Sequence, residues 1–248
     1  PSNHRYDTAN YARIDPELGT EENFASLVGA LHENGMRVML DGVYNHASWQ
    51  HPFWQDVLKN GEKSAYFDWF CGVSMEVLRG KTSKELTADV MRGEKPFESF
   101  AFAADMPKWN TENPAVQDYL IGTAAEWTRK YGVDAWRLDV PDEVSFRFLE
   151  HFKKRIRKTN PEAYIIGEIW QTSTAWLRAG VFDGAMDYPL YFAIRDFAMK
   201  RTDGVETFAE RIKDVFLSAP DCVRPRQLAF CGNHDIPRPL TVCGGDTD

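Results

Sequence analysis

Five short stretches of this 248-residue chain place acidic, amide or imidazole side chains next to apolar, strand-like runs. Such side chains are costly inside a core unless they are paired or reach solvent. The carboxyl ends of parallel strands meet at one edge of a sheet, where these folds place their sites. The repetition therefore predicts one shared functional site. The stretches are residues 37–46, 106–110, 132–139, 164–168 and 230–235.

Strand-like and helix-like segments alternate along most of the chain, which is typical of βα units around a parallel sheet. Thr20 and Asn113-Pro114 are expected helix caps. The interval between Ala47 and Asp105 breaks the rhythm and is rich in aromatic residues, so we expect a small inserted domain with its own core. Helices are expected from 21 to near 35 and over 114–130, 144–157, 191–200 and 205–217, and strands over 38–40, 133–140, 163–169, 182–186 and 227–231.

Composition excludes several kinds of partner. The formal net charge is −8, which disfavours binding to nucleic acid or to an anionic membrane surface. No apolar run approaches the roughly 20 residues of a membrane span, and no basic-then-apolar leader is visible. The four cysteines lack zinc-site spacing. We expect reduced thiols in a cytoplasmic protein, with a disulfide in an exported protein as the alternative.

The polar stretches resemble the signature sequences of the α-amylase superfamily of glycoside hydrolases, over essentially the whole chain. Asp41–His46 is similar to the first signature, Trp136–Asp139 to the second, Gly167-Glu168 to the third and Asn233–Asp235 to the fourth. Met106–Asn110 resembles the short signature of the neopullulanase, cyclomaltodextrinase and maltogenic amylase subgroup. This chain has Trp109 where that subgroup usually has Leu.

The resemblance implies an α/β fold, the (β/α)8 TIM barrel. The chain would begin after barrel strand 2 and end before strand 8, so strands 1, 2 and 8 and the subgroup's terminal β-domains would be missing. We therefore expect a fragment with three parts: barrel residues 1–46, an inserted domain over 47–105 after strand 3, and barrel residues 106–248 with strands 4 to 7. Open sheet edges predict exposed apolar faces and poor stability or association.

The resemblance also implies catalytic roles. Asp139 would be the nucleophile, Glu168 the general acid/base, and Asp235 would stabilise the transition state. The residues support these roles, because Arg137 lies two positions before Asp139 and shares its strand face. A guanidinium there favours the ionised nucleophile. Glu168 follows an apolar run, which favours the protonated form that an acid needs.

A retaining mechanism predicts about 5–5.5 Å between the carboxyl groups of Asp139 and Glu168. Asn45 matches a calcium ligand of many relatives, but no clear acidic cluster follows it, so we expect no required cofactor, with calcium as an optional ligand. The partner would be an oligosaccharide or polysaccharide α-glucan, and the parent protein a homodimer. The further residues that resemblance implies at the substrate are Tyr6, Asp41, His46, Arg137, Glu143 and His234.

Taken singly, these residues have simpler interpretations. Asp139 and Arg137 could form a structural ion pair, Glu168 could cap a helix, and His46 could be a core histidine. The joint pattern favours a retaining hydrolase of maltodextrins, cyclodextrins or pullulan. The alternatives are a transglycosylase, an α-glucosidase or an inactive fragment of such an enzyme. A non-catalytic relative is disfavoured, because all three acids are present.

Overall fold

A computed structural model describes residues 2–78, 80–94, 96–101 and 103–245. Residues 1–163 and 164–248 form two compact units. The first contains α1 (Glu21–Glu33), β1 (Met39–Gly42), α2 (Pro52–Asn60), α3 (Met75–Leu78), α4 (Ser83–Met91), α5 (Pro114–Tyr131), β2 (Ala135–Leu138) and α6 (Phe146–Thr159). The second contains β3 (Tyr164–Gly167), α7 (Thr174–Arg178), β4 (Gly184–Ala185), α8 (Tyr188–Ile194), α9 (Val205–Ser218) and α10 (Pro239–Val242).

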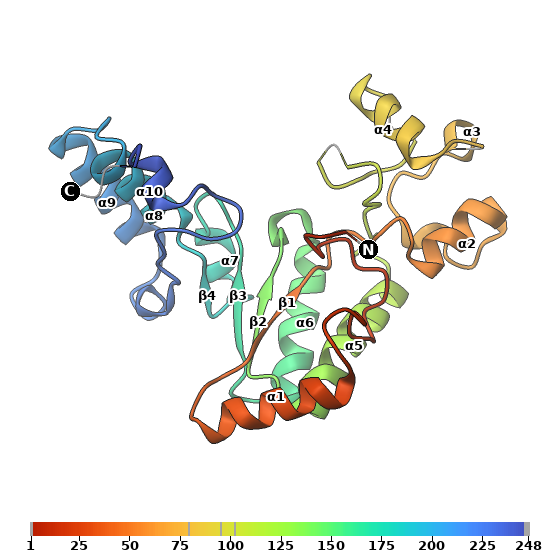
Figure 1. The fold of residues 1–248 in the computed structure, drawn as a ribbon, viewed down its shortest axis with the longest axis horizontal. Coiled ribbons are helices and arrows are strands. Elements are labelled where there is room, and N and C mark those ends of the chain that lie inside the picture. Colours follow the sequence, from red (N-terminus) through yellow and green to blue (C-terminus); the bar gives the residue numbers. More distant parts are fainter. Residues whose placement is uncertain (1, 79, 95, 102, 246–248) are drawn as a thin grey trace. The chain divides into compact units, whose positions relative to one another are not determined.

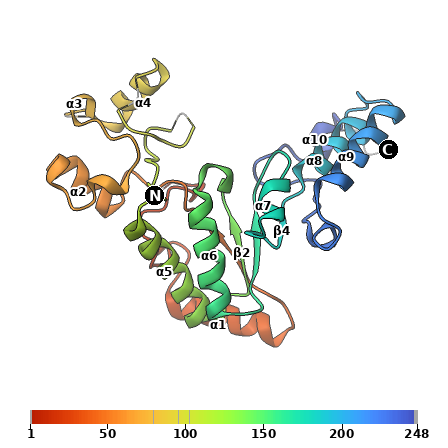
Figure 2. The same ribbon diagram turned by 180° about the vertical axis from the view of Figure 1, so that it is seen from behind.

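Two parallel strands form the centre of the first unit. Their register pairs Asp41 of β1 with Arg137 of β2. All four residues of β2 are buried, and α5 and α6 run side by side along this strand (Figures 1 and 2). Trp136 Nε1 donates to Thr128 Oγ1 of α5 at 3.0 Å, and its ring meets Phe152 of α6 edge-on. The two helices therefore cover the β2 face that points away from Arg137.

Local capping sets the helix boundaries close to the expected positions. The side chain of Thr20 accepts a hydrogen bond from Asn23 N at 3.3 Å at the start of α1. Asn113 accepts from Ala115 N at 2.9 Å, and Pro114 occupies the first turn of α5. Both predicted caps are confirmed. Helix α6 begins later than expected, because the hydroxyl of Ser145 caps it.

The inserted segment 47–105 builds an aromatic core within the first unit. Trp54 is fully buried, and its ring lies 4.9 Å from that of Phe70 and 4.8 Å from that of Phe97. Trp109 stacks on Phe70 at 4.6 Å and donates from Nε1 to Tyr11 Oη at 3.0 Å. Trp109 and Tyr11 lie outside 47–105, so this aromatic core is continuous with the rest of the first unit, and an inserted domain with a core of its own stays a prediction. The three-part division of the chain stays a prediction.

The second unit is built on a shorter parallel pair. Gly184 and Ala185 of β4 pair with Ile166 and Gly167 of β3. The predicted strand over 182–186 is therefore only two residues long. Helix α8 continues into one π-helical turn, Arg195–Met199, where the sequence predicts ordinary helix. The core of this unit contains Ile166, Met186, Tyr188 and Tyr191.

The predicted strand over 227–231 is wrong. Leu228 makes a single parallel bridge to Met186, with Leu228 N donating to Ala185 O at 3.0 Å. No named strand of the described residues includes 227–231. The apolar run is real, but β4 offers only two residues for a ladder, and Leu228 is left 45% exposed.

Exposed apolar side chains remain on the first unit. Leu27 and Met36 are 54% and 51% exposed, and Met39 of β1 is similarly open. An open sheet edge would leave apolar side chains exposed in this way, and the missing strands stay a prediction. All four cysteines are free in the structure, and their redox state stays a prediction. Within the described ranges, no helix has both the length and the apolar composition to cross a membrane.

Candidate active site

Arg137 holds the first group of predicted site residues together. Its Nη1 lies 2.7 Å from Asp41 Oδ1 and 2.9 Å from Asp139 Oδ1. Strand register brings Asp41 alongside, and the two-residue repeat of β2 brings Asp139 to the same face. Arg137 and Asp139 are 7% and 6% exposed. A guanidinium so close in a buried setting stabilises the charged carboxylate.

Tyr6 extends this group. Its hydroxyl donates to Asp41 Oδ2 at 2.9 Å, and the Arg137 guanidinium lies 5.7 Å from the centre of its ring. Burial, reinforced by the Asp41 carboxylate, raises the pKa of Tyr6 above its ordinary value. Tyr6 therefore stays a neutral phenol that presents a ring and a donor beside Asp139.

The backbone around Asp139 is tightly constrained. Asp139 N donates to Gly42 O at 3.1 Å. A Cβ on Gly42 would lie 2.5 Å from the Tyr44 ring, so only glycine fits there. The next residue, Val140, has φ 43° and ψ 47°. A β-branched residue in the left-handed region is strained, and such strain concentrates at functional sites.

The side chain of His46 is buried. It is 1% exposed, its Nε2 donates to Tyr6 O at 2.9 Å, and its ring stacks on Phe100. Burial lowers the pKa of His46 to about 4, so the ring is neutral near pH 7. His46 thus positions the backbone of Tyr6. Its direct contact with a sugar stays a prediction.

His51 is buried in the same way, and burial lowers its pKa to about 4. Between pH 6.5 and about 4, both imidazoles bind protons in the unfolded chain but stay neutral in the folded chain. The free energy of unfolding should therefore fall as pH falls from about 6.5 to about 4, by up to roughly 3 kcal/mol per histidine. Urea unfolding at pH 7, 5.5 and 4.5 measures this slope. His51→Gln should make it shallower.

The control repeats the urea series on both proteins at pH 7.5 and 8.5. At these pH values the imidazole of His51 is neutral in the folded and the unfolded chain, so wild type and His51→Gln should show the same slope. Below pH 7, a slope that is identical in wild type and His51→Gln would contradict the assignment of a neutral buried His51.

Glu168 forms the centre of the site residues in the second unit. It is 4% exposed, and its Oε1 accepts from Trp170 Nε1 at 3.0 Å and from the Tyr188 hydroxyl at 3.3 Å. The rings of Trp170 and Tyr188 stack on each other at 4.4 Å. A Cβ on Gly167 would lie 2.4 Å from the Phe182 ring, so a glycine must precede this acid. The carboxyl group is held in one orientation.

A hydrogen-bonded chain links Glu168 with the fourth signature inside the same unit. Asn233 Nδ2 donates to the Tyr188 hydroxyl at 2.8 Å, and Asp235 N donates to Asn233 Oδ1 at 2.9 Å. His234 Nε2 lies 3.3 Å from Asp235 Oδ2. The structure thus connects Glu168 and Asp235 through Tyr188. The separation of Asp139 and Glu168 stays a prediction.

Sequence reasoning missed two residues that hold Glu168. Trp170 follows Glu168 by two positions, and this closeness in sequence was the one signal available, although both residues lie after the end of β3. Tyr188 reaches Glu168 only because α8 packs beside β3. Nothing in the sequence next to either residue predicts that contact.

The residues around Asn45 do not fit a calcium ion. Asn45 is 1% exposed and its Oδ1 has no hydrogen-bond partner, which offers one oxygen ligand. Its Nδ2 lies 3.3 Å from Glu143 Oε2, and Lys108 Nζ lies 3.1 Å from that same oxygen. Calcium takes about six to eight oxygen ligands. Among the described residues, no group of three or more His, Cys, Asp or Glu side chains is arranged to hold a metal ion.

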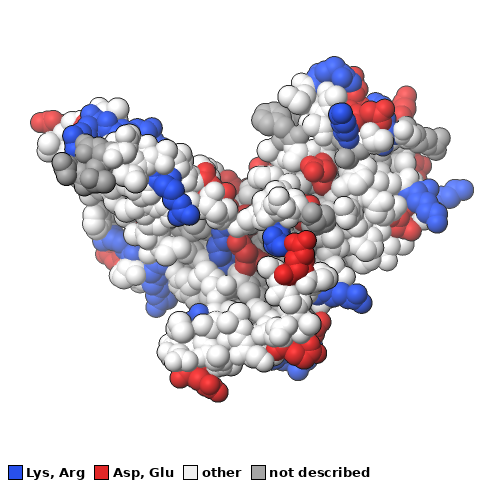
Figure 3. Space-filling view, viewed as in Figure 1, with Lys and Arg blue, Asp and Glu red and all other residues white. Residues whose placement is uncertain are grey.

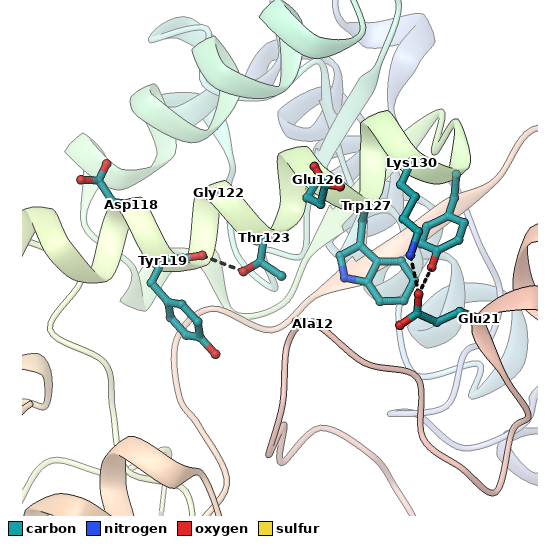
Figure 4. A pocket seen from close by; sticks show the side chains of 10 residues that line it. Ala12, Glu21, Asp118, Tyr119, Gly122, Thr123, Glu126, Trp127 and Lys130 are labelled. Carbon is teal, nitrogen blue, oxygen red and sulfur yellow. Dashed lines mark hydrogen bonds and ion pairs between the residues drawn. The ribbon is translucent and has the colours of Figure 1, made fainter.

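A separate hollow of about 420 Å³ lies along α5 (Figure 4). Tyr119 and Trp127 line it, while Glu21 accepts hydrogen bonds from Lys130 and from Tyr131. Trp127 Nε1 donates to Tyr11 O at 2.9 Å. None of the predicted site residues lines this hollow.

On the face shown in Figure 3, Lys and Arg side chains are interspersed with Asp and Glu side chains.

Comparisons with known proteins agree on one family. The family model described as "Alpha amylase, catalytic domain" matches residues 1–248. A cyclomaltodextrinase from Geobacillus thermopakistaniensis (strain MAS1) is 42% identical over 246 residues, which are 99% of this chain and 40% of that protein. An intracellular maltogenic amylase from Bacillus subtilis (strain 168) is 39% identical over 246 residues, 99% of this chain and 39% of that protein.

A solved cyclomaltodextrinase structure has the same fold. It superposes with a TM-score of 0.90 at 39% identity, over 99% of this chain and 40% of its own. The chain therefore spans about 40% of the length of these relatives. Its partial parallel sheet is that of an α-amylase catalytic domain.

Proposed function

The chain belongs to the α-amylase catalytic-domain family, and we propose that the whole protein is a retaining glycoside hydrolase of α-glucans. The observation that carries this proposal is the cluster in which the buried Arg137 bridges the buried Asp139 and the partly exposed Asp41. A buried carboxylate kept charged by a guanidinium is what a glycosidic nucleophile requires. Tyr6 adds an aromatic ring beside it, suited to stacking on a sugar.

The proposed reaction has two displacements. Asp139 attacks the anomeric carbon while Glu168 protonates the leaving oxygen, so the glycosidic bond breaks and a glycosyl–Asp139 ester forms. Glu168 then takes a proton from water, which attacks the same carbon and releases Asp139. Asp235 stabilises the positive charge that develops on the sugar. The two donors on Glu168 Oε1 orient this carboxyl group for proton transfer.

The remaining predicted residues serve binding in this proposal. Arg137 and Asp41 position Asp139 and Tyr6, and His234 donates to sugar hydroxyls from beside Asp235. Glu143, which is paired with Lys108, lies in the loop that follows Asp139 and contacts sugar on the leaving-group side. The reaction needs no cofactor in this scheme.

We propose small α-glucans, above all cyclodextrins, as substrates, with maltodextrins and pullulan as further ones. Support comes from the relatives named cyclomaltodextrinase. Sugar release from β-cyclodextrin, with soluble starch alongside, tests this on the complete protein. Faster turnover of the cyclodextrin is expected. Faster turnover of starch would reject the cyclodextrin preference, and release of reducing sugar from neither would reject the hydrolase itself.

We further propose that the protein acts in the cytoplasm as a homodimer. A relative is named an intracellular maltogenic amylase, which supports the location. Cell fractionation and light scattering of the purified protein measure the two properties. Recovery outside the cell or a monomeric mass would contradict them.

A further inference from the structure

Three segments of the first unit meet at the pair Lys108–Glu143. Asn45 follows β1, Lys108 follows the inserted segment, and Glu143 belongs to the short helical turn Pro141–Glu143 after Asp139. We propose that the Lys108 ammonium is the resident cation of this junction, taking the place of a metal ion. The junction is then tied together without calcium.

The backbone holds Lys108 in a fixed place. Lys108 N donates to Glu98 O at 2.9 Å, and Lys108 O accepts from Cys71 N at 3.1 Å. An isolated bridge joins Lys108 to His46. The side chain is 17% exposed and spans from this anchored backbone to Glu143 Oε2. Because the backbone of Lys108 is fixed and its side chain is mostly buried, forming the ion pair costs less side-chain conformational entropy than forming an exposed ion pair.

Charge at the junction favours one bound cation, and Lys108 already provides it. The pair borders a hollow of about 240 Å³ whose lining also includes Glu98, Glu112 and Asp142. A calcium ion bound by Asn45 and Glu143 would lie within a few ångströms of the Lys108 ammonium. Repulsion at such a distance costs several kcal/mol near a protein surface, so the ion and the lysine exclude each other.

The junction has too few oxygen ligands for calcium, and Asn45 Oδ1 is one of them. This buried oxygen has no partner, while Nδ2 of the same amide faces Glu143. One neutral oxygen and one carboxylate are too few for calcium. Lys108→Asp would remove the repulsion and add a carboxylate to Asn45 Oδ1 and Glu143, and water in the adjoining hollow would supply the remaining ligands. The inference therefore predicts that Lys108→Asp creates a calcium site.

The test measures terbium luminescence, sensitised by nearby tryptophan, and thermal unfolding with calcium or EDTA, in the complete protein. In wild type we expect no terbium emission that Asn45→Ala abolishes. We also expect no difference in Tm between calcium and EDTA that Asn45→Ala abolishes. Lys108→Asp should gain saturable emission that calcium displaces, and a Tm that rises with calcium. Lys108→Asn is the substitute if Lys108→Asp folds under neither condition.

Lys108→Met removes the ammonium without adding a ligand. It should lower Tm by about 2–4 °C relative to wild type. Lys213→Met is the matched control, because Lys213 pairs with Glu210 at 3.8 Å on an exposed helix surface and should leave Tm unchanged. Two outcomes overturn the proposal. The first is terbium emission from wild type that calcium displaces and that Asn45→Ala abolishes. The second is that Lys108→Asp and Lys108→Asn fold but show neither calcium-sensitive terbium emission nor a Tm that rises with calcium.

Discussion

Asp139→Asn should reduce turnover of an α-glucan by roughly 10³-fold or more, with the fold intact. The amide keeps the size of the side chain but cannot form the glycosyl ester. Arg137 retains Asp41 as a partner, at 2.7 Å, so the loss of charge at position 139 does not leave the guanidinium unpaired. The measurement is kcat on β-cyclodextrin, with circular dichroism to monitor folding.

Asp118→Asn is the matched control for this experiment. Asp118 is an exposed carboxylate on α5, outside the predicted site residues, so the same chemical change there should leave kcat unaltered. Turnover of Asp139→Asn within a factor of ten of wild type would remove Asp139 from the nucleophile role. A mass increase of one sugar on trapped wild-type protein, absent in Asp139→Asn, would locate the intermediate independently.

Glu168→Gln should discriminate between substrates. General acid catalysis contributes roughly 10²–10⁴-fold, and an activated aryl glycoside needs little of it because its leaving group departs unprotonated. We therefore expect kcat to fall by about 10³-fold on a maltodextrin but far less for bond cleavage in 4-nitrophenyl maltoside. Gln keeps the oxygen that accepts hydrogen bonds from Trp170 and Tyr188, so the site geometry should survive.

Burst kinetics refine this test, because the second displacement also uses Glu168. In Glu168→Gln the release of 4-nitrophenol should show a fast burst followed by slow turnover, as the glycosyl ester accumulates. Glu206→Gln, an exposed change on α9, is the control. Equal losses on both substrates without a burst would count against Glu168 as the acid/base.

Features with a local cause were predictable from sequence. Thr20 and the Asn113-Pro114 pair cap their helices through contacts within three residues. The pairing of Arg137 with Asp139 follows from the two-residue repeat of a strand, and the structure shows it. The motifs likewise identified the family, which the match over the whole chain confirms.

Features that depend on distant partners were not predictable. The run 227–231 looks like a strand, but strand formation needs a neighbour, and the only bridge is from Leu228 to Met186, just after the two-residue β4, among the described residues. Tyr188 reaches Glu168 across 20 positions of the chain. The ion pair of Lys108 with Glu143 spans 35 positions, and its effect on the calcium expectation emerges only once both side chains are placed.

The strained backbone at Val140 has a consequence for protein engineering. A left-handed valine costs free energy that Gly or Asn at the same φ and ψ would recover. A selection for thermal tolerance should therefore repeatedly enrich these two substitutions. The same change loosens the peptide that follows Asp139, so the enriched variants should be slower enzymes. At this position heat resistance and catalytic speed are competing traits, and a library that screens for only one will drift away from the other.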